Sequence, residues 1–214
     1  MEDRLLTPLD RVLAGIDGFV RGIVAPPSGA ARPSPAQAVA EAPLADDERR
    51  RAAALMRVNH AGEVAAQGLY EGHAAVARSA GMAAHLRDAA DEERDHLAWC
   101  AERLRELESS PSLFRPLWFA GAWLIGAASG VLGDRWSLGF VAETERQVEE
   151  HLTGHLDRLP AGDRRSRAIL EAMREEERRH GERATSRGGR ELPWLVRRAM
   201  RLTAGVMKLT ASRL

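Results

Sequence analysis

The sequence predicts an all-α protein: a four-helix bundle with a long crossover helix between bundle helices two and three, and an amphipathic helix at each end. Three observations lead to this prediction. Apolar residues recur at helical spacing through most of the chain, and no strand-like alternation competes with them. Two parts of the chain carry the same pattern of Glu and His residues, and a long apolar stretch separates them.

The first 44 residues are expected to lie outside the main folded unit. Residues 1–24 predict an amphipathic helix, because apolar side chains such as Leu5, Leu9 and Ile16 recur at helical spacing among charged ones. Residues 25–44 are rich in Ala, Pro, Ser and Gly, which is typical of a flexible linker. Residues 45–214 then form one domain, which is long enough to bury a sizeable core.

Within that domain, four bundle helices are expected at about 47–79, 83–108, 135–158 and 163–187, with Gly and Pro residues near most of their ends. Residues 192–214 predict a last amphipathic helix. Leu195, Leu202 and Leu209 fall on one side of it, and basic residues lie elsewhere.

Two halves of the bundle repeat one arrangement of candidate metal ligands. Each half has a helix that gives one Glu and a following helix that gives Glu-x-x-His. The intervals nearly match, with 30 residues from Glu63 to Glu93 and 32 from Glu145 to Glu177. The candidate ligands are Glu63, Glu93, His96, Glu145, Glu177 and His180. This is the ligand pattern of a carboxylate-bridged two-metal site in a four-helix bundle.

The chemistry of this set favours two divalent cations. Residues three apart project from one helix face, so Glu93 and His96 reach the same ion, as do Glu177 and His180. Four carboxylates offset the charge of two divalent ions, and without cations they would take up protons. Oxygen and nitrogen ligands without thiolate suit iron or manganese better than copper(I). The spacing leaves open whether His60 and His151 hydrogen-bond ligand carboxylates or are ordinary capped or solvated histidines.

The most apolar stretch, residues 113–133, is expected to be the crossover helix. Its uncharged run, 116–133, has 18 residues, or about 27 Å as a helix, which is close to the minimum for a membrane span. A single span would place the two halves of the metal site on opposite sides of a bilayer. We therefore expect the stretch to run along the bundle, with its aromatic face either in a membrane surface or in ordinary helix packing.

Composition excludes several other classes of protein. Thirty-one basic residues balance 31 acidic ones, so nothing favours nucleic acid as a partner. The single cysteine, Cys100, excludes an intramolecular disulfide framework and an all-thiolate metal site, and it fits a reducing compartment. No Gly-x-Gly-x-x-Gly motif in a strand–helix context predicts a nicotinamide or flavin site. No secretory signal peptide is expected in residues 1–24.

Four segments of the chain resemble the demethoxyubiquinone hydroxylase family. They are Leu55-Met56-Arg57-Val58-Asn59-His60-Ala61-Gly62-Glu63, Asp91-Glu92-Glu93-Arg94-Asp95-His96, Val141-Ala142-Glu143-Thr144-Glu145 and Glu176-Glu177-Arg178-Arg179-His180. The first segment is the specific one, since other ferritin-like proteins share Glu-x-x-His pairs. The resemblance covers about residues 45–214.

The resemblance implies a ferritin-like diiron monooxygenase that is bound peripherally to the cytoplasmic face of the cell membrane. It implies two iron ions per chain on the six candidate ligands, with His151 beside the site. It further implies O2-dependent hydroxylation of a polyprenyl demethoxy-benzoquinol in ubiquinone biosynthesis, and it allows other proteins of that pathway as partners. The segments 113–133 and 192–214, and also 1–24, would then contact the membrane interface.

Two readings from other classes stay open at this stage. A ferritin-like ferroxidase or peroxidase would use the same ligands but would need no quinol. A non-enzymatic, membrane-associated helical scaffold would carry the same Glu and His residues on solvated faces and would bind no metal.

Overall fold

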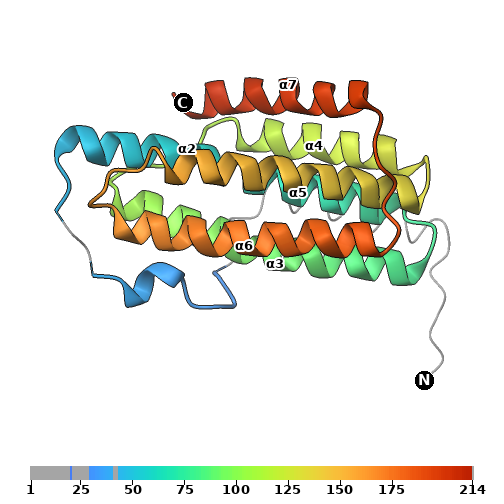
Figure 1. Cartoon of the computed structure of the whole chain (residues 1–214), viewed down its shortest axis with the longest axis horizontal. Coiled ribbons are helices and arrows are strands. Elements are labelled where there is room, and N and C mark those ends of the chain that lie inside the picture. Colours follow the sequence, from blue (N-terminus) through green and yellow to red (C-terminus); the bar gives the residue numbers. More distant parts are fainter. Residues whose placement is uncertain (1–19, 21–28, 41–42, 214) are drawn as a thin grey trace.

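A computed structural model describes residues 20, 29–40 and 43–213, and this part of the chain is helical without any strand (Figure 1). The elements are η1 (Pro35–Ala38), α2 (Asp46–Val76), α3 (Ala80–Glu106), α4 (Arg115–Gly130), α5 (Asp134–Leu156), α6 (Arg164–Ser186) and α7 (Trp194–Ala211). These bounds confirm the all-α prediction and agree with the expected helices to within a few residues. The helix expected over residues 1–24 lies almost wholly outside the described residues.

The bundle consists of α2, α3, α5 and α6, and it confirms the expected crossover. Two antiparallel pairs, α2 with α3 and α5 with α6, supply the two halves of the sequence repeat. In Figure 1, α3 and α5 run in the same direction, and α4 travels the length of the bundle between them. A short loop cannot join two parallel helices, because the connection has to run the length of the bundle. The apolar stretch makes this connection as helix α4.

The bundle core has an apolar cluster toward each end and a polar layer between them. One cluster contains Met56, Leu104, Leu152 and Leu170. The other contains Tyr70, Leu86, Leu138, Val141 and Ala184. The candidate ligands lie between these two groups along every bundle helix. Burial of the apolar side chains, worth about 1.5–3 kcal/mol for each large one, therefore supports the helices on both sides of the polar layer.

Helix α4 packs so closely on α2 that their backbones touch. A Cβ added at Gly126 of α4 would lie 2.4 Å from the carbonyl oxygen of Leu69, and one added at Gly72 of α2 would lie 2.2 Å from the carbonyl oxygen of Trp123. Only residues without a side chain allow this approach. Gly130, four residues after Gly126, also faces α2, because a Cβ added there would lie 2.4 Å from Cγ2 of Val76.

The outer sides of α4 and α7 carry many exposed apolar side chains. They are Leu117, Leu124 and Ile125 of α4, Leu113, Val131 and Leu132 beside it, and Trp194, Leu195, Leu202, Val206 and Leu209 of α7. Among the helices that the structure describes, none has the length and apolar character needed to cross a membrane.

The segment expected to be a flexible linker, 25–44, is folded against the bundle in residues 29–40. Figure 1 shows it beside α6 and α3, on the side of the bundle away from α7. Ser34 begins η1 by accepting the N–H of Ala36, and Ala36 is buried in the apolar cluster near the start of α2. Composition suggested flexibility because small residues lack a helical apolar pattern, whereas here they allow close docking on a neighbouring surface.

The α2–α4 contact generates a test with a matched control on one helix. We expect Gly126→Ala to lower the melting temperature, because the added methyl group meets backbone and such overpacking costs about 1–3 kcal/mol or more. Gly121→Ala should leave stability unchanged or raise it by up to about 1 kcal/mol, since nothing lies within 4 Å of its added Cβ. Equal melting temperatures for the two variants would contradict the close helix contact.

Candidate metal centre

The structure brings all six candidate ligands together in the polar layer of the bundle. Glu63 comes from α2, Glu145 from α5, and each Glu-x-x-His pair from α3 or α6. Every one of these side chains is buried. They form two overlapping groups whose ligand atoms lie within 4.8 Å of one another: Glu63, Glu93, His96 and Glu177, and Glu93, Glu145, Glu177 and His180. Glu93 and Glu177 belong to both groups, as bridging carboxylates would.

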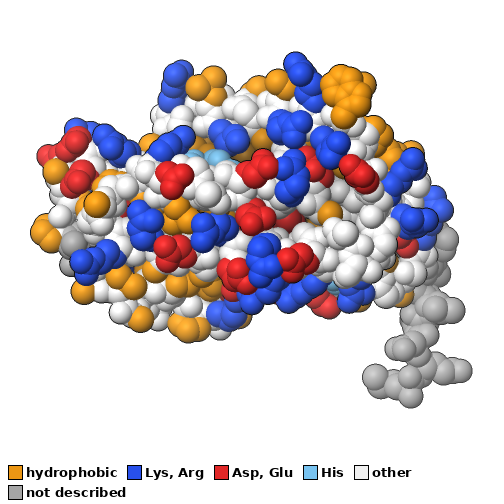
Figure 2. All heavy atoms as spheres, viewed as in Figure 1, with side chains coloured by type: hydrophobic (Ala, Val, Ile, Leu, Met, Phe, Trp, Pro, Cys, Tyr) orange, Lys and Arg blue, Asp and Glu red, His pale blue; other side chains and the backbone are white. Residues whose placement is uncertain are grey.

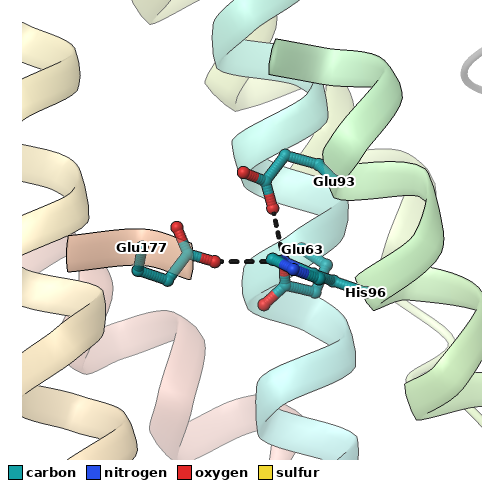
Figure 3. A group of neighbouring side chains, drawn as sticks. All are labelled: Glu63, Glu93, His96 and Glu177. Carbon is teal, nitrogen blue, oxygen red and sulfur yellow. Dashed lines mark hydrogen bonds and ion pairs between the residues drawn. The ribbon is translucent and has the colours of Figure 1, made fainter. Parts of the chain in front are cut away.

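His96 faces the centre of the first group with its Nδ1 atom. This nitrogen lies 2.9 Å from Glu93 Oε2, 3.2 Å from Glu177 Oε1 and 3.6 Å from Glu63 Oε2. Figure 3 shows Glu93 and Glu177 approaching the His96 ring from two different helices. One imidazole nitrogen thus lies among three carboxylates, the environment of a metal-binding histidine.

His180 takes the equivalent place in the second group. Its Nδ1 atom lies 3.0 Å from Glu93 Oε1 and 3.7 Å from Glu177 Oε2. The two histidines therefore approach opposite oxygen atoms of the same two carboxylates. This geometry follows from the sequence repeat, because α3 and α6 present the same Glu-x-x-His face toward each other.

The electrostatics show that the site needs positive charge. Burial raises the pKa of the Glu63 carboxyl well above its ordinary value, against the opposing hydrogen bond with His96. Burial, together with the charge of Glu177, raises the pKa of Glu145 in the same direction. Ionising all four glutamates without cations is therefore unfavourable, and protons remain on some of them.

The histidines respond in the opposite sense. Burial opposes protonation of His180, but the neighbouring carboxylates of Glu177 and Glu93 raise its pKa to about 12. Burial likewise opposes protonation of His96, yet the charge of Glu93 raises its pKa well above the ordinary value. In the absence of a metal ion, the protons on the two imidazoles thus supply the positive charge that offsets the ligand carboxylates.

Several buried ligand atoms are positioned for a cation rather than for a hydrogen bond. Within the described part of the chain, no hydrogen bond of ordinary geometry reaches Glu93 Oε1, Glu145 Oε2, either oxygen of Glu177 or His180 Nδ1. Unpartnered buried polar atoms are costly unless a ligand satisfies them. Their donor set of carboxylate oxygens and imidazole nitrogens is one that iron accepts, so the residues present fit a two-metal centre.

Two further glutamates orient the histidines from outside. His96 Nε2 lies 2.8 Å from Glu176 Oε2, and His180 Nε2 lies 2.8 Å from Glu92 Oε2. Such contacts hold the imidazole so that its other nitrogen faces the metal. Sequence reasoning missed both residues, although a signal was present: each directly precedes a candidate ligand, at Glu93 or Glu177, so they belong to the same half-repeat.

Tyr70 is the one tyrosine of the chain, and it contacts the site directly. Its hydroxyl donates to Glu145 Oε1 at 2.6 Å. Burial, with the nearby charge of Glu145, raises the pKa of this hydroxyl well above its ordinary value. Tyr70 therefore stays protonated and holds one oxygen of Glu145 in place.

The sequence left open whether His60 and His151 hydrogen-bond ligand carboxylates, and among the described residues neither has a hydrogen bond to a candidate ligand. His60 is fully buried, and neither of its ring nitrogens has a hydrogen-bond partner among the described residues. The ring of His151 lies 3.8 Å from that of His155, whose Nδ1 hydrogen-bonds Asn59. Spacing could not decide between the two roles, because a shared helix face permits contact with a carboxylate, whereas packing between helices decides which contact forms.

A helical bundle with a buried layer of four glutamates and two histidines defines the class of carboxylate–histidine metal proteins built on four helices. The chain belongs to the family described as "Ubiquinone biosynthesis protein COQ7", whose model matches residues 50–211. This confirms the resemblance noted from the sequence.

Curated relatives match over nearly their whole length. The chain is 53% identical over 211 residues to "3-demethoxyubiquinol 3-hydroxylase" of Xanthomonas euvesicatoria pv. vesicatoria (strain 85-10), covering 99% of this chain and 97% of the relative. It is 51% identical over 225 residues to the protein of the same name from Ralstonia pickettii (strain 12J), covering all of both.

A solved structure supports the ferritin-like fold. The bacterioferritin-related protein of Bacteroides fragilis, described as a dodecameric thioferritin, matches with a TM-score of 0.53. The match covers 64% of this chain and 84% of that one at 19% sequence identity. At this identity the likeness concerns the fold alone.

The site geometry predicts how metal binds. We expect metal-free protein to take up two Fe(II) or Co(II) ions per chain under anaerobic conditions and to release protons as it does so. Binding should weaken as the pH falls, because cations and protons compete for the same buried groups. Isothermal titration calorimetry in buffers of different ionisation heat measures the released protons.

Two Glu→Gln variants on α5 provide a test of one ligand and its matched control. Glu145→Gln should lose at least one metal equivalent, whereas Glu150→Gln on the same helix should bind as the wild type does, since Glu150 is exposed. Full metal binding by the Glu145 variant would contradict its place among the ligands.

Proposed function

We propose that this protein is a 3-demethoxyubiquinol 3-hydroxylase, which uses O2 and a diiron centre to hydroxylate a polyprenyl demethoxy-benzoquinol. The observation that carries the proposal is the buried layer with two overlapping ligand groups, in a chain whose full-length relatives bear this name. One oxygen atom of O2 replaces a ring C–H with C–OH, and the other leaves as water. Two electrons, from a reductant that delivers them either directly or through the quinol itself, and two protons complete the balance.

The six ligands, Glu63, Glu93, His96, Glu145, Glu177 and His180, would hold two iron ions. Iron, when bound, supplies the activation of O2. The residues around it position this chemistry and limit the access of water. Tyr70 fixes one oxygen of Glu145, and Glu176 and Glu92 fix the histidine rings. The apolar clusters on both sides of the layer keep bulk water from the centre.

The outer surface of α4 and α7 fits a substrate with a long prenyl tail. The side of α7 that the sequence marks as apolar faces outward, with Leu202 and Val206 more than half exposed. Figure 2 shows hydrophobic and basic side chains together along the edge where α7 lies. Trp118 of α4 and Met207 of α7 both pack against a small apolar cluster formed by Val58 and Ala61 of α2 and Ala211 of α7, so the two helices lie over the same part of α2.

We propose that this surface lies in the interface of a membrane with anionic lipids, peripherally and without a span. Apolar side chains between basic ones are the pattern of an interfacial helix, and each Lys or Arg near such a surface adds about 1 kcal/mol of attraction. The exposed residues Arg198 and Arg201 of α7 supply part of this charge. The prenyl tail would then enter from the lipid, next to α2, which carries Glu63.

The hydroxylase proposal is tested by quinone analysis in cells that lack the gene. We expect demethoxyubiquinone to accumulate, as seen by mass spectrometry of lipid extracts, and the wild-type gene to restore ubiquinone. Glu177→Ala should fail to restore it, because a ligand shared by both groups is lost. Glu175→Ala should restore it, since Glu175 is exposed on the same helix.

Two other results together would favour a ferroxidase over the hydroxylase. Normal ubiquinone without the intermediate in the deletion strain would argue against the hydroxylase. Oxidation of Fe(II) by the purified protein with no quinol present would then identify a ferroxidase on the same ligands.

The membrane proposal is tested by sedimentation with vesicles. The wild-type protein should bind vesicles that contain anionic phospholipid, and binding should fall as salt is added. Leu202→Glu should reduce binding several-fold, because it places a charge in the apolar strip. Ala84→Glu, an equal change of charge at an exposed position of α3, should have little effect. Equal binding by both variants would argue against α7 as the contact surface.

A further inference from the structure

The two halves of the metal centre have matching ligands but different surroundings. The difference comes from residues 29–40, which pack on α3 and α6 beside the first ligand group, that of His96. We call these residues the strap. No strap residue belongs to either ligand group, and no sequence pattern connects this segment with the site.

Arg32 is the centre of the strap's contacts. Its Nη1 and Nη2 atoms donate to the two oxygens of Glu176 at 2.8 and 2.9 Å, a bidentate pair. Its Nε donates to Asp95 Oδ2. The guanidinium thereby joins a carboxylate of α6 to one of α3. Paired, charge-assisted contacts of this kind fix the geometry of both partners more firmly than a single hydrogen bond does.

Neighbouring groups hold Arg32 in this position. The N–H of Ala31 donates to Asp95 Oδ1 at 2.7 Å, and Trp99 Nε1 donates to the carbonyl oxygen of Arg32 at 3.2 Å. The guanidinium lies 4.9 Å from the centre of the Trp99 ring, a cation–π contact. Backbone and side chain of the strap are thus both anchored on α3.

These contacts continue to a ligand. Glu176 Oε2, held by Arg32, lies 2.8 Å from His96 Nε2, while His96 Nδ1 faces Glu93 and Glu177. Arg32 therefore acts on the first ligand group through one intermediate residue. Groups that orient a metal-binding histidine in this way commonly change metal affinity 10- to 100-fold when they are removed.

The second half lacks this support. His180 Nε2 contacts Glu92 as His96 contacts Glu176, but the Glu92 side chain is 42% exposed and that of Glu176 only 12%. Among the described residues, the one arginine or lysine that pairs with Glu92 is Arg183, at 3.4 Å and itself 51% exposed. The two halves also differ at Asp95, which binds the strap, because the equivalent position of the second half is occupied by Arg179.

We propose that Arg32 is a positioning residue that makes the two metal positions unequal, so that the group of Glu63, Glu93, His96 and Glu177 binds its ion more tightly than the group of Glu93, Glu145, Glu177 and His180. The strap keeps Glu176 directed at His96 and screens it from water, whereas Glu92 is free to exchange its contact for solvent. This inference rests on the proposed metal-binding function of the six ligands.

The test is a stepwise metal titration of the full chain. Metal-free wild-type protein is titrated anaerobically with Co(II), and the ligand-field absorption of the bound ion and the heat of binding are recorded. We expect two steps of different affinity. Arg32→Ala should weaken the tighter step about 10- to 100-fold and leave the weaker step nearly unchanged. Arg183→Ala, the same substitution in the other half, should leave the tighter step unchanged.

Two additions separate positioning from general stability. Methylguanidinium in solution should restore the tighter step in Arg32→Ala, because the Arg32 side chain is 42% exposed and the small cation can reach the same carboxylates. Arg32→Lys should give an intermediate affinity, since one ammonium group cannot make the bidentate contact. Circular dichroism of each metal-free variant shows whether the bundle is folded.

The outcomes are distinct. Equal weakening of both steps by Arg32→Ala, or no change in either, would overturn the inference. So would a loss of affinity in the folded variant that methylguanidinium does not restore and that Arg183→Ala reproduces. If the wild-type protein binds no Co(II) or Fe(II) at all, the proposed metal function itself fails, and that result is recognised before any variant is compared.

Discussion

The structure depends on the burial of four glutamates and two histidines in one layer of the bundle. Such a set is tolerable only when positive charge lies among the carboxylates, because the interior does not solvate isolated anions. Without metal, protons supply that charge: burial raises the pKa of Glu63 and Glu145, and the imidazoles stay protonated. The apolar clusters on either side contribute the stability that this layer does not provide.

The same constraint explains the residues around the ligands. Each histidine has one nitrogen toward the carboxylate layer and the other toward an outer glutamate, Glu176 or Glu92. The two outer glutamates come from equivalent positions of the half-repeat, so the inner part of the site has approximate twofold symmetry. The symmetry does not extend further. Asp95 accepts hydrogen bonds from the strap, whereas Arg179, the equivalent residue of the second half, is a cation and cannot accept them. A centre with matching ligands thereby has one screened side and one open side.

The crossover helix links the interior to the surface. Backbone contact at Gly72 and Gly126 holds α4 against α2, the helix that carries Glu63. Because one side of α4 packs on α2, the apolar side chains on its other side are exposed, as are those of α7. An apolar outer surface on a bundle with a buried set of candidate metal ligands suits the proposed apolar substrate better than it suits storage of iron in water.

The sequence by itself determined the helices, the crossover, the six candidate ligands and the family resemblance. It could do so because these features have local signatures: helical spacing of apolar residues, Glu-x-x-His on one face, and a repeat with matched intervals. Tertiary structure alone decided the rest. Arg32 and Glu176 are 144 residues apart, and no periodicity predicts a contact between a compositionally flexible segment and a helix so far along the chain. His60 and His151 show the same limit, because spacing places a side chain on a face, but only packing between helices selects its partner.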